Sequence, residues 1–386
     1  MAVDHQPTFS RTSLNILIVA CVGLILIFGQ SSKESSEMNI PPAPKLNVSS
    51  WVSDSGAKVW FSPKLDDHIS IQLDYLAGFA YNQPPFAKGS SYLLVSLLNH
   101  EAKLSRLPIH FELKADFIEA SVQLSTEPLT MKHQLKAIQN LLYRPTLANK
   151  ALQDAKLIIQ KPFDSLWQQA FTGHDYAGPK QGSEQSLSGI HRASLQKFQQ
   201  SYLHPQRLFV GISGNINQQA AQVIVETLLP VSKYPVKKST PISSQPTSQL
   251  VNNDNGILVL EGSTNNTEPL IQQRIGLCIL KALPVQGMRF VDQQANNVVL
   301  IEHWSNVLDA MDTEVNSDMM RQAKRQCIKH AFAQTHNGQA VSRFLAWLNR
   351  YELPSHFLKM QFDALANWQE KDWLELKHAW FEPRQE

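Results

Sequence analysis

The feature that most constrains this chain is an uncharged apolar run close to its N-terminus. Residues 14–28 read LNILIVACVGLILIF, and neighbouring small residues can extend the run towards the length of about 20 residues that a bilayer span needs. A cleaved signal peptide is the alternative, since its apolar core has about 7–15 residues, but no clean A-x-A-like cleavage site follows the run. The run therefore favours an uncleaved transmembrane anchor at 14–29, behind a short tail at 1–13.

The orientation of this anchor follows from the short segment before it. The charge bias across the run is slight, with Asp4 and Arg11 before it and Lys33, Glu34 and Glu37 after it. Because the preceding segment is short, we expect the body of the chain to lie outside the cytoplasm. The expected location is a bacterial inner membrane, crossed once, with the body in the periplasm.

Two stretches with almost no apolar periodicity divide the rest of the chain. Residues 30–46 are polar and proline-rich, which predicts a tether. Residues 237–255 are rich in Ser, Thr, Pro and Asn, which predicts a linker. Since 386 residues are more than a single hydrophobic core usually serves, we expect two domains, at 47–236 and 256–386.

Both domains are expected to mix strands and helices. Alternation of apolar and polar residues predicts strands, and apolar stripes at helical spacing predict helices. The expected strands are 57–61, 69–76, 118–124, 208–213, 257–260 and 298–304. The expected helices are 88–99, 129–142, 149–171, 191–203, 217–228, 317–334, 339–350, 356–368 and 371–380. Within 149–171, a break is expected at Pro162. No regular βαβ alternation is present, so we predict an α+β fold in which each domain is an antiparallel sheet packed with helices.

Composition and motifs exclude several functional classes. The net charge is +2, with basic and acidic residues interspersed and no basic block, which argues against nucleic acid as a partner. There is no phosphate-binding loop, no dinucleotide fingerprint and no G-x-S-x-G elbow of a serine hydrolase. Three cysteines are too few for a disulfide framework; Cys278 and Cys327 pair only if the fold brings them together, and otherwise are buried small side chains.

The segment 171–216 carries a distinctive order of residues: a turn, a glycine, a helix that ends in Tyr-x-x-Pro, and a strand that ends in glycine. The residues in these positions are His174, Tyr176, Pro179, Gly182, Phe198, Tyr202, Pro205 and Gly214. This order resembles the insulinase/pitrilysin family of zinc metallopeptidases. Residues 316–332 and 352–373 resemble the late helices of that family, and the likeness extends over most of residues 50–386.

The resemblance implies a two-domain unit that forms half of a hinged clamshell, and it implies a zinc site. Active members carry H-x-x-E-H on a helix, where two His hold zinc and the Glu activates water. Matched to that motif, this chain has Tyr92, Val95 and Ser96. The Glu of a later helix that completes the zinc ligands would fall near Lys161 or Pro162. We therefore predict no catalytic residues, no metal and no cofactor.

Two other places approach a zinc motif without completing it. His100-Glu101 begins like H-E-x-x-H, but Leu104 stands where the second His is required. Glu302-His303 lies in a predicted strand, where residues four apart do not share a helical face. Both are interpreted as ordinary polar pairs.

Two residues of the 171–216 turn are candidates for binding. The resemblance places His174 and Tyr176 near the cleft, where they would position a substrate backbone, although turns use such residues structurally as well. Active relatives also grip the substrate with an Arg and a Tyr from the second domain. Here Arg289 is the nearest candidate, and no Tyr follows it at the required distance.

The resemblance and the missing motif together give the predicted function. We expect a membrane-anchored, non-catalytic homologue of the insulinase-family peptidases. It would act as the partner subunit of a zinc-bearing homologue, or as a scaffold that binds a peptide or an unfolded protein. The alternative is an active zinc metalloendopeptidase with an unusual site.

Overall fold

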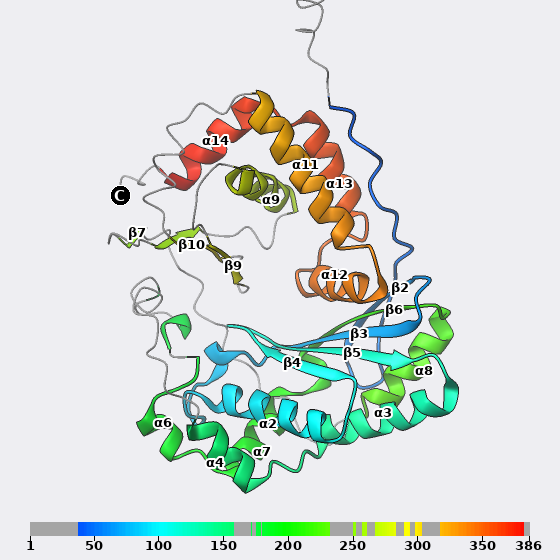
Figure 1. Ribbon diagram of the computed structural model, residues 1–386, viewed down its shortest axis with the longest axis vertical. Coiled ribbons are helices and arrows are strands. Elements are labelled where there is room, and N and C mark those ends of the chain that lie inside the picture. The colour runs from blue at the N-terminus through cyan, green and yellow to red at the C-terminus, as the bar shows by residue number, and fades with distance from the viewer. Residues whose placement is uncertain are drawn as a thin grey trace, which may run out of the picture. The chain divides into compact units, whose positions relative to one another are not determined.

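The computed structural model shows an α+β fold (Figure 1). It describes residues 38–157, 171, 175–178, 180–231, 250–251, 257–260, 267–282, 289–293, 298–302 and 317–381. The predicted anchor at 14–29 lies outside these residues and stays a prediction. Within the described segments, no helix has both the length and the apolar character that crossing a bilayer requires. Residues 42–386 form one compact unit.

The first sheet has six strands in the order β1-β2-β6-β3-β5-β4. They are β1 (Ser49–Val52), β2 (Lys58–Pro63), β3 (His68–Tyr75), β4 (Ile109–Leu113), β5 (Ile118–Ser125) and β6 (Leu208–Gly214). The prediction of an antiparallel sheet is wrong for one pair, because β2 and β6 run parallel. β6 is inserted between β2 and β3, which run in opposite directions, so it must be parallel to one of them.

The burial of the strands follows their sequence patterns. In β5 the alternating residues Ile118, Ala120, Val122 and Leu124 are almost completely buried, while the residues between them are more exposed. Central strand β3 is buried along its whole length after its first residue. It has this pattern because helices cover both faces of the sheet.

One face of this sheet is covered by helices of the first half of the chain (Figure 1). They are α2 (Ser90–Leu104), α3 (Pro128–Tyr143), α4 (Asn149–Leu157), α6 (Glu184–Ser188), α7 (Arg192–Tyr202) and α8 (Gln218–Leu228). Several of them begin at a capping side chain: Asn217, for example, accepts a hydrogen bond from the amide of Ala220 at 2.8 Å. The predicted helix 149–171 is described only to Leu157, and its predicted break at Pro162 lies outside the described residues.

The opposite face is covered by α12 (Gly338–Arg350), a helix from the second half of the chain. It lies so close to β6 that a Cβ atom on Gly211 would come within 1.9 Å of the Ser342 carbonyl oxygen. The Asn349 side-chain amide also donates to the carbonyl oxygen of Lys58, at 2.8 Å. A helix of the predicted domain 256–386 therefore completes the sheet of the predicted domain 47–236; the boundaries themselves stay predictions.

The second sheet has four strands in the order β7-β8-β10-β9, and all its pairs are antiparallel, as predicted. Its strands are β7 (Leu250–Val251), β8 (Ile257–Leu260), β9 (Arg289–Gln293) and β10 (Val298–Glu302). Besides α12, the described part of this half contains the helices α9 (Thr267–Ala282), α11 (Ser317–Ala333), α13 (Phe357–Asn367) and α14 (Glu370–Phe381). Helix α9 packs against α11, α13 and α14.

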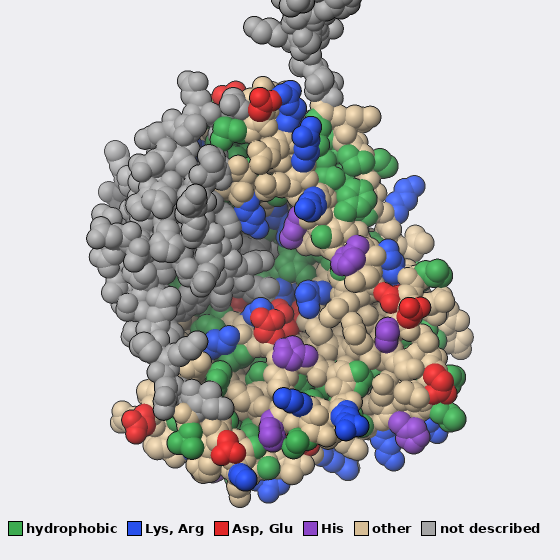
Figure 2. All heavy atoms as spheres, viewed as in Figure 1, with side chains coloured by type: hydrophobic (Ala, Val, Ile, Leu, Met, Phe, Trp, Pro, Cys, Tyr) green, Lys and Arg blue, Asp and Glu red, His purple; other side chains and the backbone are tan. Residues whose placement is uncertain are grey.

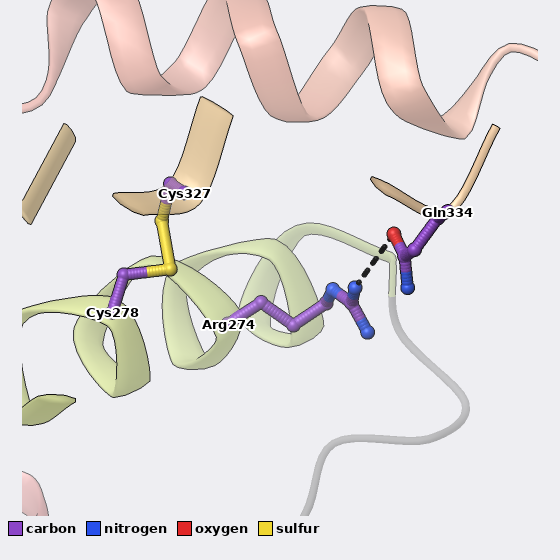
Figure 3. Close-up of a disulfide and its surroundings, with 4 residues drawn as sticks. All are labelled: Arg274, Cys278, Cys327 and Gln334. Carbon is purple, nitrogen blue, oxygen red and sulfur yellow. Dashed lines mark hydrogen bonds between the residues drawn. A yellow bond between two sulfur atoms is a disulfide. The ribbon is translucent and has the colours of Figure 1, made fainter. Parts of the chain in front are cut away.

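A disulfide joins α9 to α11 (Figure 3). It links Cys278 and Cys327, whose Cα atoms are 5.6 Å apart. Further along the same two segments, Arg274 donates to the side-chain oxygen of Gln334 at 3.3 Å. The guanidinium of Arg274 also lies 4.7 Å from the ring centre of Trp347, which connects α9 to α12. The pairing of the two cysteines, which their spacing left open, is thus present.

Candidate functional site

The three residues matched to the zinc motif lie on the first two turns of α2. Residues four apart share one face of a helix, so Tyr92 and Ser96 lie on the same side. Val95 is packed into the core with 7% of its surface exposed. The Ser96 hydroxyl donates to the carbonyl oxygen of Tyr92 at 2.9 Å, within its own helix.

These side chains do not fit a zinc ion. Zinc in proteins is held by thiolates, imidazoles and carboxylates. The three positions on α2 offer a phenol, an isopropyl group and a hydroxyl that is already hydrogen-bonded to its own helix. The fourth position, near Lys161 or Pro162, lies outside the described residues. Within the described segments, no group of three or more His, Cys, Asp and Glu is placed to hold a metal.

The incomplete motif at His100-Glu101 has a different use in the fold. His100 is exposed on α2, while the Glu101 carboxylate accepts a hydrogen bond from the Thr146 amide at 2.9 Å and one from its hydroxyl at 3.1 Å. Glu101 thus ties α2 to the loop between α3 and α4. Glu302 lies in β10, as predicted, and His303 lies outside the described residues.

Tyr176 lies in a short 3-10 helix, Asp175–Ala177, and is completely buried. Its hydroxyl donates to a carboxylate oxygen of Asp116 at 2.7 Å, and its ring meets Phe171 edge to face at 5.4 Å. The turn is therefore fastened to the loop after β4. His174 lies outside the described residues, so the predicted binding role of His174 and Tyr176 stays a prediction, and the contacts of Tyr176 are structural ones.

Asp116 is a buried carboxyl beside this turn. Burial raises the pKa of Asp116 to about 7, against the opposing hydrogen bond from Tyr176. Among the described residues, the second carboxyl oxygen of Asp116 has no hydrogen-bond partner. No local pattern around Asp116 indicates this burial, because it depends on how two distant loops pack together.

A buried ion cluster lies between α12 and the first sheet. The guanidinium of Arg350 lies 3.1 Å from a carboxylate oxygen of Asp74 on β3 and 3.3 Å from one of Glu119 on β5. It also lies 4.4 Å from the ring centre of Phe117. Burial raises the pKa of Asp74 to about 7, although Arg350 opposes this shift. Sequence reasoning missed this cluster, since its members come from three separate elements.

A pocket of about 760 Å³ with a mixed polar and apolar lining lies elsewhere, at the ends of α3 and α7. It is lined by cationic and amide side chains, among them Lys136, Gln139, Arg144 and Gln199. The described residues among the earlier candidates, Tyr92, Val95, Ser96 and Tyr176, do not line it. The amide of Gln199 is already used, since it donates to the Leu142 carbonyl oxygen at 2.6 Å.

Comparison with known proteins relates the chain to solved structures. No family model matches the sequence, and no curated protein matches it. The peptidase M16 inactive domain from Pseudomonas fluorescens superposes with a TM-score of 0.71 at 15% identity, over 87% of this chain and 95% of that chain. A protease from Helicobacter pylori gives a TM-score of 0.71 at 13% identity, over 88% and 97%.

A longer relative shows the same unit within a larger chain. The periplasmic protease PqqL from Escherichia coli gives a TM-score of 0.66 at 12% identity, over 88% of this chain and 47% of that chain. The present chain thus spans about half the length of PqqL. These superpositions confirm the resemblance at the level of fold: the chain has the fold of the insulinase-like M16 peptidases.

Proposed function

We propose that this chain is a non-catalytic homologue of the insulinase-like zinc peptidases. The observation that carries the proposal is α2, where Tyr92, Val95 and Ser96 replace the two ligands and the base of the zinc motif. Without a Glu at the position of Val95, the degenerate motif has no carboxylate to activate water. The likeness to a structure described as an inactive M16 domain supports the same proposal.

The proposed role is that of a partner subunit or a protein-binding scaffold. The chain matches half of PqqL, a protease about twice its length. This length ratio supports a second unit of the same fold as the partner, and a zinc-bearing homologue would supply the missing catalysis. The second candidate is an independent scaffold that binds peptides or unfolded proteins without a catalytic partner.

The proposed location is the inner membrane of a bacterium, with the body in the periplasm. The apolar run at 14–29 supports an anchor. The disulfide between Cys278 and Cys327 supports an oxidising compartment, because disulfides are rare where thiols are kept reduced. Alkylation of free thiols before and after reduction, in intact cells, tests this; an unpaired Cys278 in the mature protein contradicts the proposed location.

The lack of catalysis is tested on the full chain purified from solubilised membranes. We expect no stoichiometric zinc by elemental analysis and no peptide cleavage that a chelator abolishes. Bound zinc together with chelator-sensitive cleavage would establish the alternative, an active metalloendopeptidase with an unusual site. Restoring the motif by Tyr92→His, Val95→Glu and Ser96→His provides a comparison for zinc binding in the same fold.

Pairing is tested by co-purification. Affinity capture of the full chain from solubilised membranes is expected to recover a zinc-bearing homologue in equal amount. Consistent absence of such a homologue, with other proteins recovered instead, would support the independent scaffold and reject pairing.

A further inference from the structure

The pocket at the ends of α3 and α7 is a groove with a polar stripe on each of two walls. On α3 and directly after it, Lys136, Asn140 and Arg144 line the pocket at intervals of four residues. On α7, Gln196 and Gln200 line it at the same interval. Residues four apart lie on one face of a helix, so each helix turns a single polar face towards the pocket.

Two further amides of the pocket connect the helices that border it. The side-chain amide of Gln199 on α7 donates to the Leu142 carbonyl oxygen on α3 at 2.6 Å. The side-chain amide of Gln139 on α3 donates to the carbonyl oxygen of Thr227, near the end of α8, at 2.5 Å. Hydrogen bonds therefore join the C-terminal parts of α7 and α8 to α3, and the groove lies where these helices meet.

The side chains of the two stripes are available to a ligand. Among the described residues, no hydrogen bond or ion pair involves the side chains of these five residues, Lys136, Asn140, Arg144, Gln196 and Gln200. They provide two cations and three amides. Each amide has a carbonyl oxygen that accepts hydrogen bonds and an amino group that donates them.

The two helices that carry the stripes have positive side chains only. Neither α3 nor α7 contains Asp or Glu, whereas α3 contains Lys132 and Lys136 and α7 contains Arg192 and Lys197. Side chains of both charge signs are mixed over the face of the molecule shown in Figure 2, so this bias is local. The described residues that line the pocket include no Asp or Glu either. A negatively charged ligand is therefore attracted to the groove.

Carboxylates of adjoining segments are already engaged. Glu101 accepts hydrogen bonds from the amide and the hydroxyl of Thr146, two residues after Arg144, at 2.9 Å and 3.1 Å. Glu226 on α8 accepts from the Asp54 amide, which lies 3.1 Å and 3.2 Å from its two carboxylate oxygens. Neither carboxylate lines the pocket. Among the described residues, the two cations of the groove thus have no carboxylate that neutralises them.

The length of the groove indicates an elongated ligand. Lys136 and Arg144 are eight residues apart in sequence, which corresponds to about 12 Å along a helix axis. A compact anion such as phosphate is too small to contact both, whereas an extended peptide advances about 3.3 Å per residue and covers this distance with about four residues. The pocket volume of about 760 Å³ is within the range of about 300–1,000 Å³ found for ligand sites.

The chemistry of the groove fits the end of a polypeptide. Each residue of an extended chain offers one N–H donor and one carbonyl acceptor, and side-chain amides can pair with both. Arg144 and Leu203 directly follow the last residues of α3 and α7, at ends that the bond from Gln199 to Leu142 joins. Leu203 and the exposed Val231 both line the pocket. A guanidinium pairs with a carboxylate through two parallel hydrogen bonds, so this end suits a terminal carboxylate beside an apolar side chain.

We propose that this groove binds the last few residues of an extended peptide that carries a free C-terminal carboxylate. Arg144 pairs with the carboxylate. The amides of the two stripes, on Asn140, Gln196 and Gln200, hydrogen-bond with the peptide backbone. This inference rests on the proposed function, a protein-binding role for the chain, and adds the chemistry of the ligand and a site outside the degenerate zinc motif.

Isothermal titration calorimetry of the full chain in detergent tests the inference. The probe is an N-acetylated pentapeptide of Gly and Ala that ends in Leu with a free carboxylate. The comparison is the same peptide with a C-terminal amide, which lacks the negative charge. We expect the carboxylate form to bind about tenfold more tightly, because only this form can pair with the Arg144 guanidinium.

Three variants separate the parts of the groove. Arg144→Gln should weaken binding of the carboxylate form about tenfold and leave the amide form within about twofold. Gln200→Ala should weaken both forms about threefold, because its amide contacts the backbone that they share. Lys132→Gln is the matched control, since Lys132 is an exposed lysine on α3 that does not line the pocket, and it should leave both affinities unchanged.

Several results would overturn the inference. They are equal affinities for the two forms, no measurable binding of either form, and an undiminished preference for the carboxylate form in Arg144→Gln. Full displacement of the peptide by an equal concentration of inorganic phosphate is another, since it indicates a site for a compact anion. Arg144→Lys keeps the charge without the paired geometry, so its preference should be intermediate; it gives a second measurement if Arg144→Gln does not fold.

Failure of this inference and failure of the proposed function give different results. Zinc content and peptide cleavage are measured on the same preparation. A zinc-free, inactive chain that does not distinguish the two peptides contradicts only the peptide-end site. A chain that holds zinc and cleaves peptides contradicts the proposed function, whatever its affinity for the carboxylate form.

Discussion

The side-chain amide of Asn99 forms two hydrogen bonds with the backbone of Phe111. Its nitrogen donates to the Phe111 carbonyl oxygen at 2.8 Å, and its oxygen accepts from the Phe111 amide at 2.8 Å. Phe111 is the middle residue of β4, an edge strand of the first sheet. The side chain of Asn99, on α2, therefore hydrogen-bonds to the Phe111 backbone groups that would otherwise be open to pairing with a further strand.

Replacing Asn99 by Ala removes both hydrogen bonds, so the amide and the carbonyl oxygen of Phe111 lose their partner on α2. We expect a loss of about 1–3 kcal/mol in the free energy of unfolding, measured by denaturant titration. The freed edge should also increase self-association at high protein concentration, measured by light scattering. Asn140→Ala, at an exposed position of α3, is the control; an Asn99→Ala variant as stable as this control contradicts the prediction.

Replacing Arg350 by Met leaves Asp74 and Glu119 near each other without their shared cation. Removing one partner of a buried ion pair costs about 3–5 kcal/mol, so we expect a loss of this size by the same titration. The exposed pair between Lys58 and Glu352, with 2.6 Å between its atoms, provides the comparison. We expect Lys58→Met to lower the free energy of unfolding by less than about 1 kcal/mol. Equal losses for both variants would show that burial of the ion pair is not the cause of the loss in Arg350→Met.

The buried carboxyls of Asp116 and Asp74 should make the protein less stable as the pH rises towards neutrality, while His330, whose pKa is lowered to about 4 by burial, acts in the opposite direction. The ordinary pKa of an Asp carboxyl is 3.8, and burial raises that of Asp116 to about 7. Between these values the folded state binds the proton that the unfolded state has lost, so a rise in pH favours unfolding. Asp74, with its pKa also raised to about 7, contributes in the same direction.

Asp116→Asn removes one of these two groups and keeps an acceptor for the Tyr176 hydroxyl. We expect the melting temperature of this variant to decline less steeply between about pH 4 and pH 7 than that of the unchanged chain. The slope should not vanish, because Asp74 still titrates. Asp154→Asn, at an exposed position of α4, should leave the slope unchanged, and an identical slope in Asp116→Asn would reject the assignment.

Gly211→Ala tests the close approach of α12 to β6. An added Cβ would stand 1.9 Å from the Ser342 carbonyl oxygen and 2.6 Å from the Ala346 amide nitrogen, so α12 must move away. We expect a loss of about 2–3 kcal/mol or more, comparable to the overpacking of a core. Gly189→Ala is the matched control, since nothing lies within 4 Å of its Cβ position; it should change stability by less than about 1 kcal/mol.

The elements with a clear local pattern were predictable from the sequence. Alternating apolar residues located β5, and the helices α3, α7, α8 and α12 followed from their apolar stripes. Strand β4 was missed although its residues alternate between buried and exposed, and so were β1, β7, β9, α6 and α9. Short runs such as β4 give too few residues to separate a strand from a loop.

The missed tertiary features share one cause. The pairing of Arg350 with Asp74 joins residues 276 positions apart, and nothing near either residue indicates the other. The parallel pairing of β2 with β6 likewise depends on where β6 enters the sheet. For the degenerate site, the missing zinc ligands on α2 could be named from the sequence, whereas the packing of Val95 and the burial of Tyr176 required the fold.

The position of α12 has a consequence for how the chain is made. Residues 47–236 leave the ribosome first, yet one face of their sheet is covered by a helix that is synthesised near the end. Until Gly338–Arg350 arrives, the apolar residues beneath it face water, and Asp74 and Glu119 lack their cation. The sheet of the first half can therefore reach its full burial only after the last helices of the chain have been made.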